Sequence, residues 1–385
     1  MYFRKTQRRF SAAGAAVLLS LLLSGCGGKG IPANYRAIED LQTVQTLGID
    51  LDADGSVTLT AAVGKAGDSG SPAVLRRSGR SIPEAINSLQ DYTERGQLFF
   101  AHVRYLVLGQ DMAAFGLDAV FDYVERDVHT RMGTELFVLR DGRAEDFMQA
   151  VADGEAITNL LDAVKRDTAL RGSSHVGSIR NAAVALSEYG AVPVCALRAV
   201  PTDGSIFSDA PALTVVPDGY AILKNGALVS FVSGGDAEAL SLLTGNLGTV
   251  SRSIPDGAGG TVTLELSGSA SISASEPTLT EITLSLDAVI AAVDAPDAPV
   301  TDAAYLEKLS AAVSAEAEEQ VLRVLGLSKS LDADFLPLAP ALQRKTGRTT
   351  LRSDWLQEME FRLHTETVMA HSYDMREPLE MEGDG

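Results

Sequence analysis

The carboxylates of a short acidic run are the first candidates for chemistry in this chain. Asp50, Asp52, Asp54 and Gly55 match positions 1, 3, 5 and 6 of an EF-hand calcium loop. Position 12 of that loop requires a bidentate glutamate, and Ala61 stands there. The flanking segments are predicted to be strands, whereas an EF-hand needs helices. We therefore interpret the run as a solvated hairpin turn and predict no metal site.

The other chemically capable residues do not form a recognisable catalytic set. The five histidines lie outside HExxH or any other ligand spacing; they are His102, His129, His175, His364 and His371. GxSxG, Walker A and strand-following GxGxxG motifs are absent. Arg126-Asp127 with Arg131 is interpreted as an ion pair at a helix end in preference to an active pair. We expect no catalytic residue, no cofactor and no enzyme activity.

A thiol near the N-terminus has the most specific sequence context. Four basic residues precede a run of apolar residues 10–23, and they are Arg4, Lys5, Arg8 and Arg9. The run is shorter than the ~20 residues of a membrane-spanning helix and suits a signal peptide. Leu23-Ser24-Gly25-Cys26 follows, with two small residues directly before the cysteine. We predict a signal peptide over 1–25 and a tether over 26–34.

Leu23-Ser24-Gly25-Cys26 resembles the bacterial lipobox. The resemblance implies cleavage before Cys26, a diacylglycerol on its thiol and an N-acyl chain such as palmitate on its amino group. Acyl chains at ~0.8 kcal/mol per buried CH₂ would hold the protein on a membrane. The alternative is an ordinary signal peptide with an incidental cysteine. The second cysteine, Cys195, lies in an apolar run and is predicted to be buried and inert.

The charge of the chain limits its partners. The 385 residues include 51 acidic and 32 basic side chains, a net charge of −19. Without residues 1–25, which hold four bases and no acid, the balance is 28 − 51 = −23. Nucleic acid and anionic lipid both require clustered Lys and Arg, so we expect no nucleic-acid partner and do not expect the body of the protein to lie on anionic lipid.

The first half of the body alternates strands and helices. Strands are predicted over 43–49, 56–63, 103–108, 134–139 and 192–200, and a loop over 64–80. Helices are predicted at 117–125, 143–151, 158–166 and 177–188, and Ser81-Ile82-Pro83-Glu84 carries the start signals of another. Residues 201–204, Pro-Thr-Asp-Gly, are the best boundary, giving an N-terminal domain over 35–200.

The second half, 201–385, is predicted to be a further α+β domain. Strands at 219–223 and 227–232 flank an Asn225-Gly226 hairpin turn. Further strands are expected at 261–266, 279–293 and 359–369, with the second long enough to bend. Helices are expected at 237–243 and 302–325, the latter the longest in the chain. The fold class is therefore α+β, multi-domain, with mixed or antiparallel sheets packed with helices.

Several ordered motifs are similar to those of the Ger(x)C family, the lipoprotein C subunits of bacterial spore nutrient-germinant receptors. Arg36-Ala37-Ile38-Glu39-Asp40-Leu41, then Gly48-Ile49-Asp50, resembles the mature start of that family. Phe99-Phe100-Ala101-His102 and the Arg126-Asp127 to Arg131 run resemble its later motifs, as do Gly219 to Ile222, Asp334-Phe335 and Trp355. Ala37 and Ala101 depart from the usual Glu and Gly. The resemblance covers nearly the whole chain through the order of its motifs.

The resemblance implies a non-catalytic receptor subunit anchored on the outer face of the spore inner membrane, beside membrane-embedded A and B subunits. Arg36, Glu39, Asp40, His102, Arg126, Asp127 and Arg131 would then support the fold or contact those subunits. One alternative is a solute-binding lipoprotein of a transporter, which sustained βαβ alternation around a cleft would favour. Another is an extracytoplasmic enzyme, for which the sequence offers no residue to mutate first.

Overall fold

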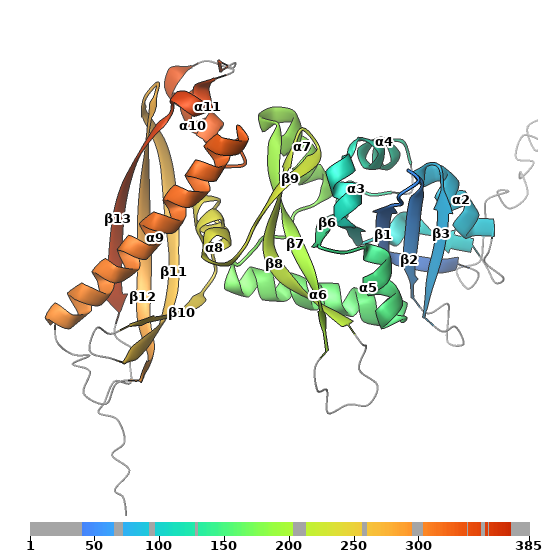
Figure 1. Cartoon of the computed structure of the whole chain (residues 1–385), viewed down its shortest axis with the longest axis horizontal. Helices are drawn as coiled ribbons and strands as arrows, with labels where there is room; N and C mark the ends of the chain where they lie inside the picture. The colour runs from blue at the N-terminus through green and yellow to red at the C-terminus, as the bar shows by residue number, and fades with distance from the viewer. Residues whose placement is uncertain are drawn as a thin grey trace, which may run out of the picture. The chain divides into compact units, whose positions relative to one another are not determined.

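A computed structural model describes residues 41–64, 72–91, 97–127, 130–202, 213–255, 260–294, 303–336, 338–347, 351–352 and 354–370. These residues form two mixed sheets packed with helices (Figure 1). The α+β class expected from the sequence is confirmed. Among the described residues, no helix is both long and apolar enough to cross a membrane.

The first sheet has nine strands, and its centre is parallel. Strands β1, β5, β6 and β7 run parallel to one another and occupy Leu41–Leu51, Tyr105–Leu108, Glu135–Arg140 and Ala191–Pro201. The antiparallel strands β2 and β3 extend one side over Val57–Val63 and Ala73–Gly79, and β8 and β9 extend the other over Leu213–Lys224 and Ala227–Val232. A short strand β4, Gln97–Phe99, also pairs with β1.

Helices cover both faces of this sheet, which explains why its central strands are apolar on both sides. Leu106 and Leu108 of β5 join the core of one face, while Tyr105 and Val107 join the core of the other. The first face packs against α2, α3, α4 and α7, which span Ile82–Asp91, Gln110–Phe115, Asp118–Arg126 and Ile179–Tyr189. The second packs against α5, Ala144–Val151, and α6, Gly154–Arg171.

The second sheet has the order β10-β11-β12-β13, with strands at Val250–Pro255, Thr261–Glu276, Leu279–Asp294 and Glu360–Ala370. Its first three strands are antiparallel, whereas β13 pairs with β12 in parallel after a crossover through α9, Ala303–Leu331. Its core also takes in α8 (Gly234–Leu243), α10 (Leu338–Thr346) and α11 (Trp355–Glu358).

Local turn signals predicted the hairpins correctly. Asn225 and Gly226 both have positive φ, 49° and 83°, as a type I′ turn between β8 and β9 requires. The loop predicted over 64–80 is wrong for Ala73–Gly79, which pairs with β2 as strand β3. The helix predicted at 158–166 is longer than expected and runs from Gly154 to Arg171.

The predicted boundary at 200/201 lies inside the first sheet. β8 and β9 follow that boundary, yet they hydrogen-bond to β7 and to each other. Tyr220, Ile222 and Val232 of these two strands also belong to the core of the second sheet. The strands directly after the boundary therefore contribute to both sheets, and the division into two domains there stays a prediction.

Candidate functional site

Two of the residues singled out by sequence, His102 and Arg131, lie together at the amino end of the parallel strands. They line one cavity of about 310 Å³, here called the amino-end cleft, whose walls are Thr43, Gln45, His102, Val103, Arg104 and Arg131. The predicted Leu23, Ser24, Gly25, Cys26, Arg36, Glu39 and Asp40 lie outside the described residues.

A single 3₁₀ turn places His102 shortly before the first residue of β5. The turn spans Phe100–His102, and the N–H of Val103 donates to the carbonyl of Phe100 at 3.1 Å. The imidazole ring stands 5.4 Å from the ring of Phe99, centroid to centroid. The backbone hydrogen bond fixes the turn, and the ring of Phe99 lies beside the imidazole that lines the cleft.

The backbone of Arg104 is fixed between two neighbouring strands. Its N–H donates to the carbonyl of Gln45 at 2.8 Å, and its carbonyl accepts the N–H of Glu135 at 2.9 Å. Its guanidinium donates to Asp162 of α6 (Nη1 to Oδ2, 3.0 Å) and to the hydroxyl of Tyr105 at 3.2 Å. Burial would raise the pKa of Asp162, but the hydrogen bonds from Tyr105 and Arg104 lower it. Arg104 is thus a rigid cation at the cleft wall.

Arg131 reaches the cleft from the turn that precedes β6. The N–H of Thr134 donates to its carbonyl at 3.0 Å, and the Thr134 hydroxyl donates to the carbonyl of Val103 at 3.0 Å. A second cavity of about 280 Å³ adjoins the cleft along Val103, Arg104 and Arg131. Its wall also holds the ion pair of Lys165 and Glu135.

Arg126 and Asp127 lie apart from this cleft at the end of α4. Arg126 Nε pairs with Asp122, one turn earlier on the same helix, at 2.5 Å. The ion pair expected at this helix end therefore uses Asp122 as its acid. The backbone N–H of Asp127 donates to the carbonyl of Tyr123 at 2.9 Å and ends the helix. Arg126 and Asp127 therefore lie at the end of α4, whereas Arg131 of the same run lies at the cleft.

The acidic run 50–55 is a structural device, and the expectation of a solvated turn is wrong for Asp50. Its carboxylate is buried and accepts the N–H groups of Ala144 (Oδ1) and Glu145 (Oδ2), both at 2.8 Å, at the start of α5. Burial raises the pKa of Asp50 to about 6. Asp52 accepts hydrogen bonds from Thr58 and Arg143, each at 2.6 Å. Among the described residues, no three His, Cys, Asp or Glu side chains gather as metal ligands.

Gly48 of the Gly48-Ile49-Asp50 motif is explained by the same contact. A methyl group at Gly48 would lie 2.8 Å from the sulfur of Met148 and 2.9 Å from Cβ of Ala144, both on α5. The glycine lets the helix approach β1 closely enough for Asp50 to cap it. This motif therefore builds the fold.

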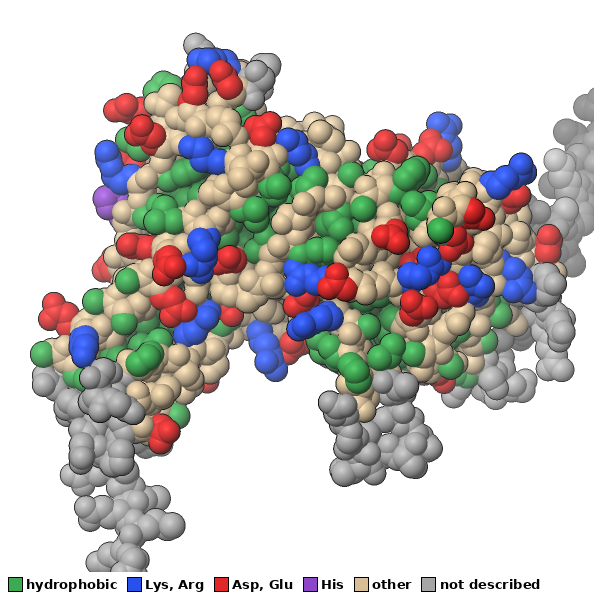
Figure 2. All heavy atoms as spheres, in the orientation of Figure 1, with side chains coloured by type: hydrophobic (Ala, Val, Ile, Leu, Met, Phe, Trp, Pro, Cys, Tyr) green, Lys and Arg blue, Asp and Glu red, His purple; other side chains and the backbone are tan. Residues whose placement is uncertain are grey.

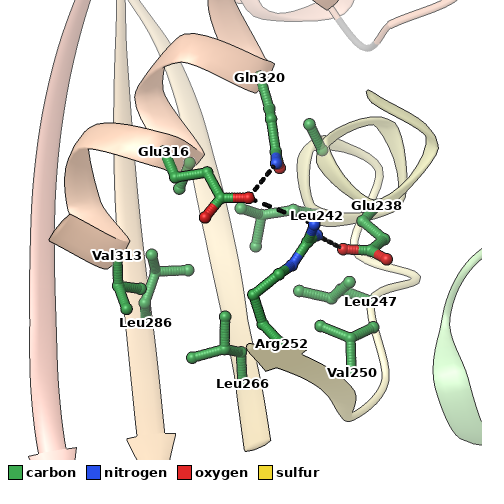
Figure 3. Close-up of a pocket in the computed structure, with 12 residues that line it drawn as sticks. Glu238, Leu242, Leu247, Val250, Arg252, Leu266, Leu286, Val313, Glu316 and Gln320 are labelled. Carbon is green, nitrogen blue, oxygen red and sulfur yellow. Dashed lines mark hydrogen bonds and ion pairs between the residues drawn. The ribbon is translucent and has the colours of Figure 1, made fainter. Parts of the chain in front are cut away.

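A third cluster, the Arg252 pocket, lies in the second half between α8, α9 and β10 (Figure 3). Arg252 extends from β10 and pairs with Glu238 of α8 and with Glu316 of α9, the latter at 3.3 Å. Gln320 donates to Glu316 at 2.9 Å, and burial raises the pKa of Glu238. The pocket volume is about 50 Å³, room for a few waters, whereas small-molecule sites usually measure ~300–1,000 Å³. The ion pairs of Arg252 therefore hold α8 and α9 against the second sheet.

The second cysteine behaves as predicted. Cys195 is buried in the first sheet, with its sulfur 3.4 Å from the hydroxyl of Ser174. Burial raises the pKa of its thiol to about 12, so it stays protonated and unreactive at neutral pH.

Sequence reasoning missed Gln45 and Arg104 of the cleft. Arg104 stands two residues after His102, but its neighbours across the sheet depend on the order of the parallel strands. The available signal was weak: a base and a histidine directly before a short apolar strand.

Comparisons with known proteins agree over both halves of the chain. The family described as "Spore germination protein N-terminal domain" matches residues 34–193, and "Spore germination B3/ GerAC like, C-terminal" matches residues 218–372. The crystal structure of the GerBC protein is similar in fold, with a TM-score of 0.54 and 16% identity over 84% of this chain and 96% of that one. No curated protein sequence matches the chain.

Proposed function

The chain belongs to the GerAC-like family of spore germination proteins, the C subunits of germination receptors, and on this premise we propose that it is a non-catalytic, membrane-anchored lipoprotein subunit required for germination signalling. The observation that carries the proposal is the pair of family matches, which together reach from residue 34 to residue 372. The similarity to GerBC supports the fold.

Anchoring is proposed through Cys26, which the lipobox residues Leu23-Ser24-Gly25 directly precede. The proposed anchor is a diacylglycerol with an added N-acyl chain, and the proposed location is the outer face of the spore inner membrane. A body of charge −23 gains little from anionic lipid as a whole, so lipid on Cys26 supplies the attachment.

The proposed partners are the membrane-embedded A and B subunits of the same receptor. The family supports a receptor context for this chain. His102, Arg131 and the other motif residues remain proposed sites of fold support or subunit contact, since the cleft that joins the first two is open on the surface of the first sheet.

Replacing Cys26 tests the anchoring and the signalling together. Cys26→Ala removes the acyl acceptor, and we expect the protein to leave the membrane fraction and the spores to respond poorly to nutrient. Cys195→Ala is the matched control, because it removes the other thiol without touching the anchor. Normal fractionation and normal germination in the Cys26→Ala strain would refute the proposal.

A further inference from the structure

We propose that the amino-end cleft binds the phosphate group of an anionic phospholipid in the membrane that carries the anchor. This rests on the lipid anchoring put forward under the proposed function. It adds a second, protein-made contact with the membrane and assigns it to a defined set of side chains.

The lining of the cleft is the first argument. Arg104, Arg131 and His102 supply guanidinium and imidazole N–H groups, and Thr43 and Gln45 supply neutral donors, while no lining residue is acidic. The charge of Arg104 is already met by its ion pair with Asp162, whereas Arg131 makes no ion pair within the described residues. On the face that Figure 2 presents, acidic and basic side chains lie close together in several places. A cavity that holds an arginine without an ion pair, and no acid among its own lining residues, therefore favours an anionic ligand even on a body of charge −23.

Unused bonding capacity is the second argument. Within the described residues, the side chains of Arg131 and Gln45 make no hydrogen bond or ion pair. Arg104 is held in place by Asp162 and Tyr105 through both of its terminal nitrogens, so it forms a fixed part of the wall that Arg131 also lines. Guanidinium groups bind phosphate and carboxylate oxygens by paired N–H donors, so a phosphate fits the donors of this cleft.

The chain path favours a membrane lipid as the source of that phosphate. Thr43 and Gln45 belong to β1, which begins at Leu41, only 41 − 26 = 15 residues after Cys26. A fully extended chain of that length spans at most ~50 Å, so the tether keeps the cleft within reach of the surface that holds the acyl chains. Tethering therefore makes the encounter with a headgroup an intramolecular event with a high effective concentration.

Chemical protection of Arg131 tests the inference on the full acylated protein. The protein is reconstituted into vesicles of phosphatidylcholine, or of equal parts of phosphatidylcholine and phosphatidylglycerol, and flotation first establishes that it is anchored in both. Phenylglyoxal then modifies accessible arginines, and mass spectrometry follows Arg131 and, as the control, the highly exposed Arg80. We expect Arg131 to react about fivefold more slowly in the phosphatidylglycerol vesicles, with Arg80 unchanged.

Additional measurements distinguish a lipid headgroup from free phosphate and from a protein partner. In phosphatidylcholine vesicles, added inorganic phosphate should leave the reaction of Arg131 unchanged, and protection there would overturn the lipid as the source. An Arg104→Gln protein should lose the lipid-dependent protection of Arg131, whereas Arg80→Gln should keep it. Equal rates for Arg131 in both vesicles refute the inference, and protection that needs co-reconstituted receptor subunits would assign the cleft to a protein partner. Failure of flotation would instead refute the anchor.

Discussion

The two ends of the parallel strands β1, β5 and β6 use their polar side chains in opposite ways. At the carboxyl end, Asp50 is buried and both of its oxygens accept N–H groups of α5. At the amino end, Arg131 and Gln45 face an open cavity, and the described part of the chain leaves their side chains without a bond. By residue type alone, the aspartates would rank as the ligand site. A polar group can serve an external ligand only where the fold leaves its bonding capacity unused.

Glycine substitutions at the two ends should differ most. Gly109 follows β5, and a methyl group there would collide with Oδ1 of Asp50, displacing the carboxylate from α5. We expect Gly109→Ala to lower the free energy of unfolding by about 4 kcal/mol, because it combines overpacking with loss of a buried cap. Gly133, at the amino end, has no atom within 4 Å of such a methyl group. Urea denaturation of both variants measures the contrast, and equal losses would contradict it.

Asp50, at the carboxyl end of the parallel strands, should contribute to the pH dependence of stability. The pKa of Asp50 rises from 3.8 to about 6 on burial, so the folded protein binds this proton more tightly than the unfolded chain does. The resulting stabilisation is complete below about pH 3.8 and is lost as the pH rises through about 6. Between those limits the wild type should lose up to about 3 kcal/mol that Asp50→Asn does not lose.

Urea denaturation at several pH values between about 4 and 7 follows this difference. Asp54→Asn is the control, because Asp54 is exposed in the same turn and its pKa is lowered by hydrogen bonds from Ser56. It should decline with pH as the wild type does. A parallel course of the wild type and Asp50→Asn would assign the pH dependence to other groups.

Replacing Arg131, at the amino end of the parallel strands, should have the smallest effect on stability. Arg131 makes no bond through its side chain within the described residues, so Arg131→Gln should change the free energy of unfolding by no more than about 0.5 kcal/mol. Thermal unfolding measures this change. A loss well above 1 kcal/mol would make Arg131 a structural residue and would erase the difference between the two ends.

Local signals in the sequence predicted the elements that local chemistry determines. The Asn225-Gly226 turn and the Ser81 start of α2 need only neighbouring residues, and both are confirmed. Strand β3 was not predicted, because it contains two arginines and follows a segment rich in Gly, Ser and Pro, as loops do. Its pairing with β2 makes it a strand. The serine-rich half of β11 extended beyond expectation for the same reason, since it is held by β12.

The candidate site was predictable only in part. His102 and Arg131 were named from motifs, but their meeting depends on β5 and β6 being parallel neighbours, a relation between segments that no short spacing encodes. Asp50 was misjudged because the helix that it caps begins 94 residues later, at Ala144. The residue types showed which groups are polar, whereas the order of the strands determined which of them find a hydrogen-bond partner within the protein.

The parallel pairing of β13 with β12 affects how the chain folds. Paired residues such as Leu279 and Glu360 are 360 − 279 = 81 residues apart, so their union carries a large loop-closure entropy and comes late in folding. Until then, the 16-residue β12 presents an open edge, which can template pairing with another copy of the chain. We therefore expect self-association to compete with the docking of the last strand while the protein is being made.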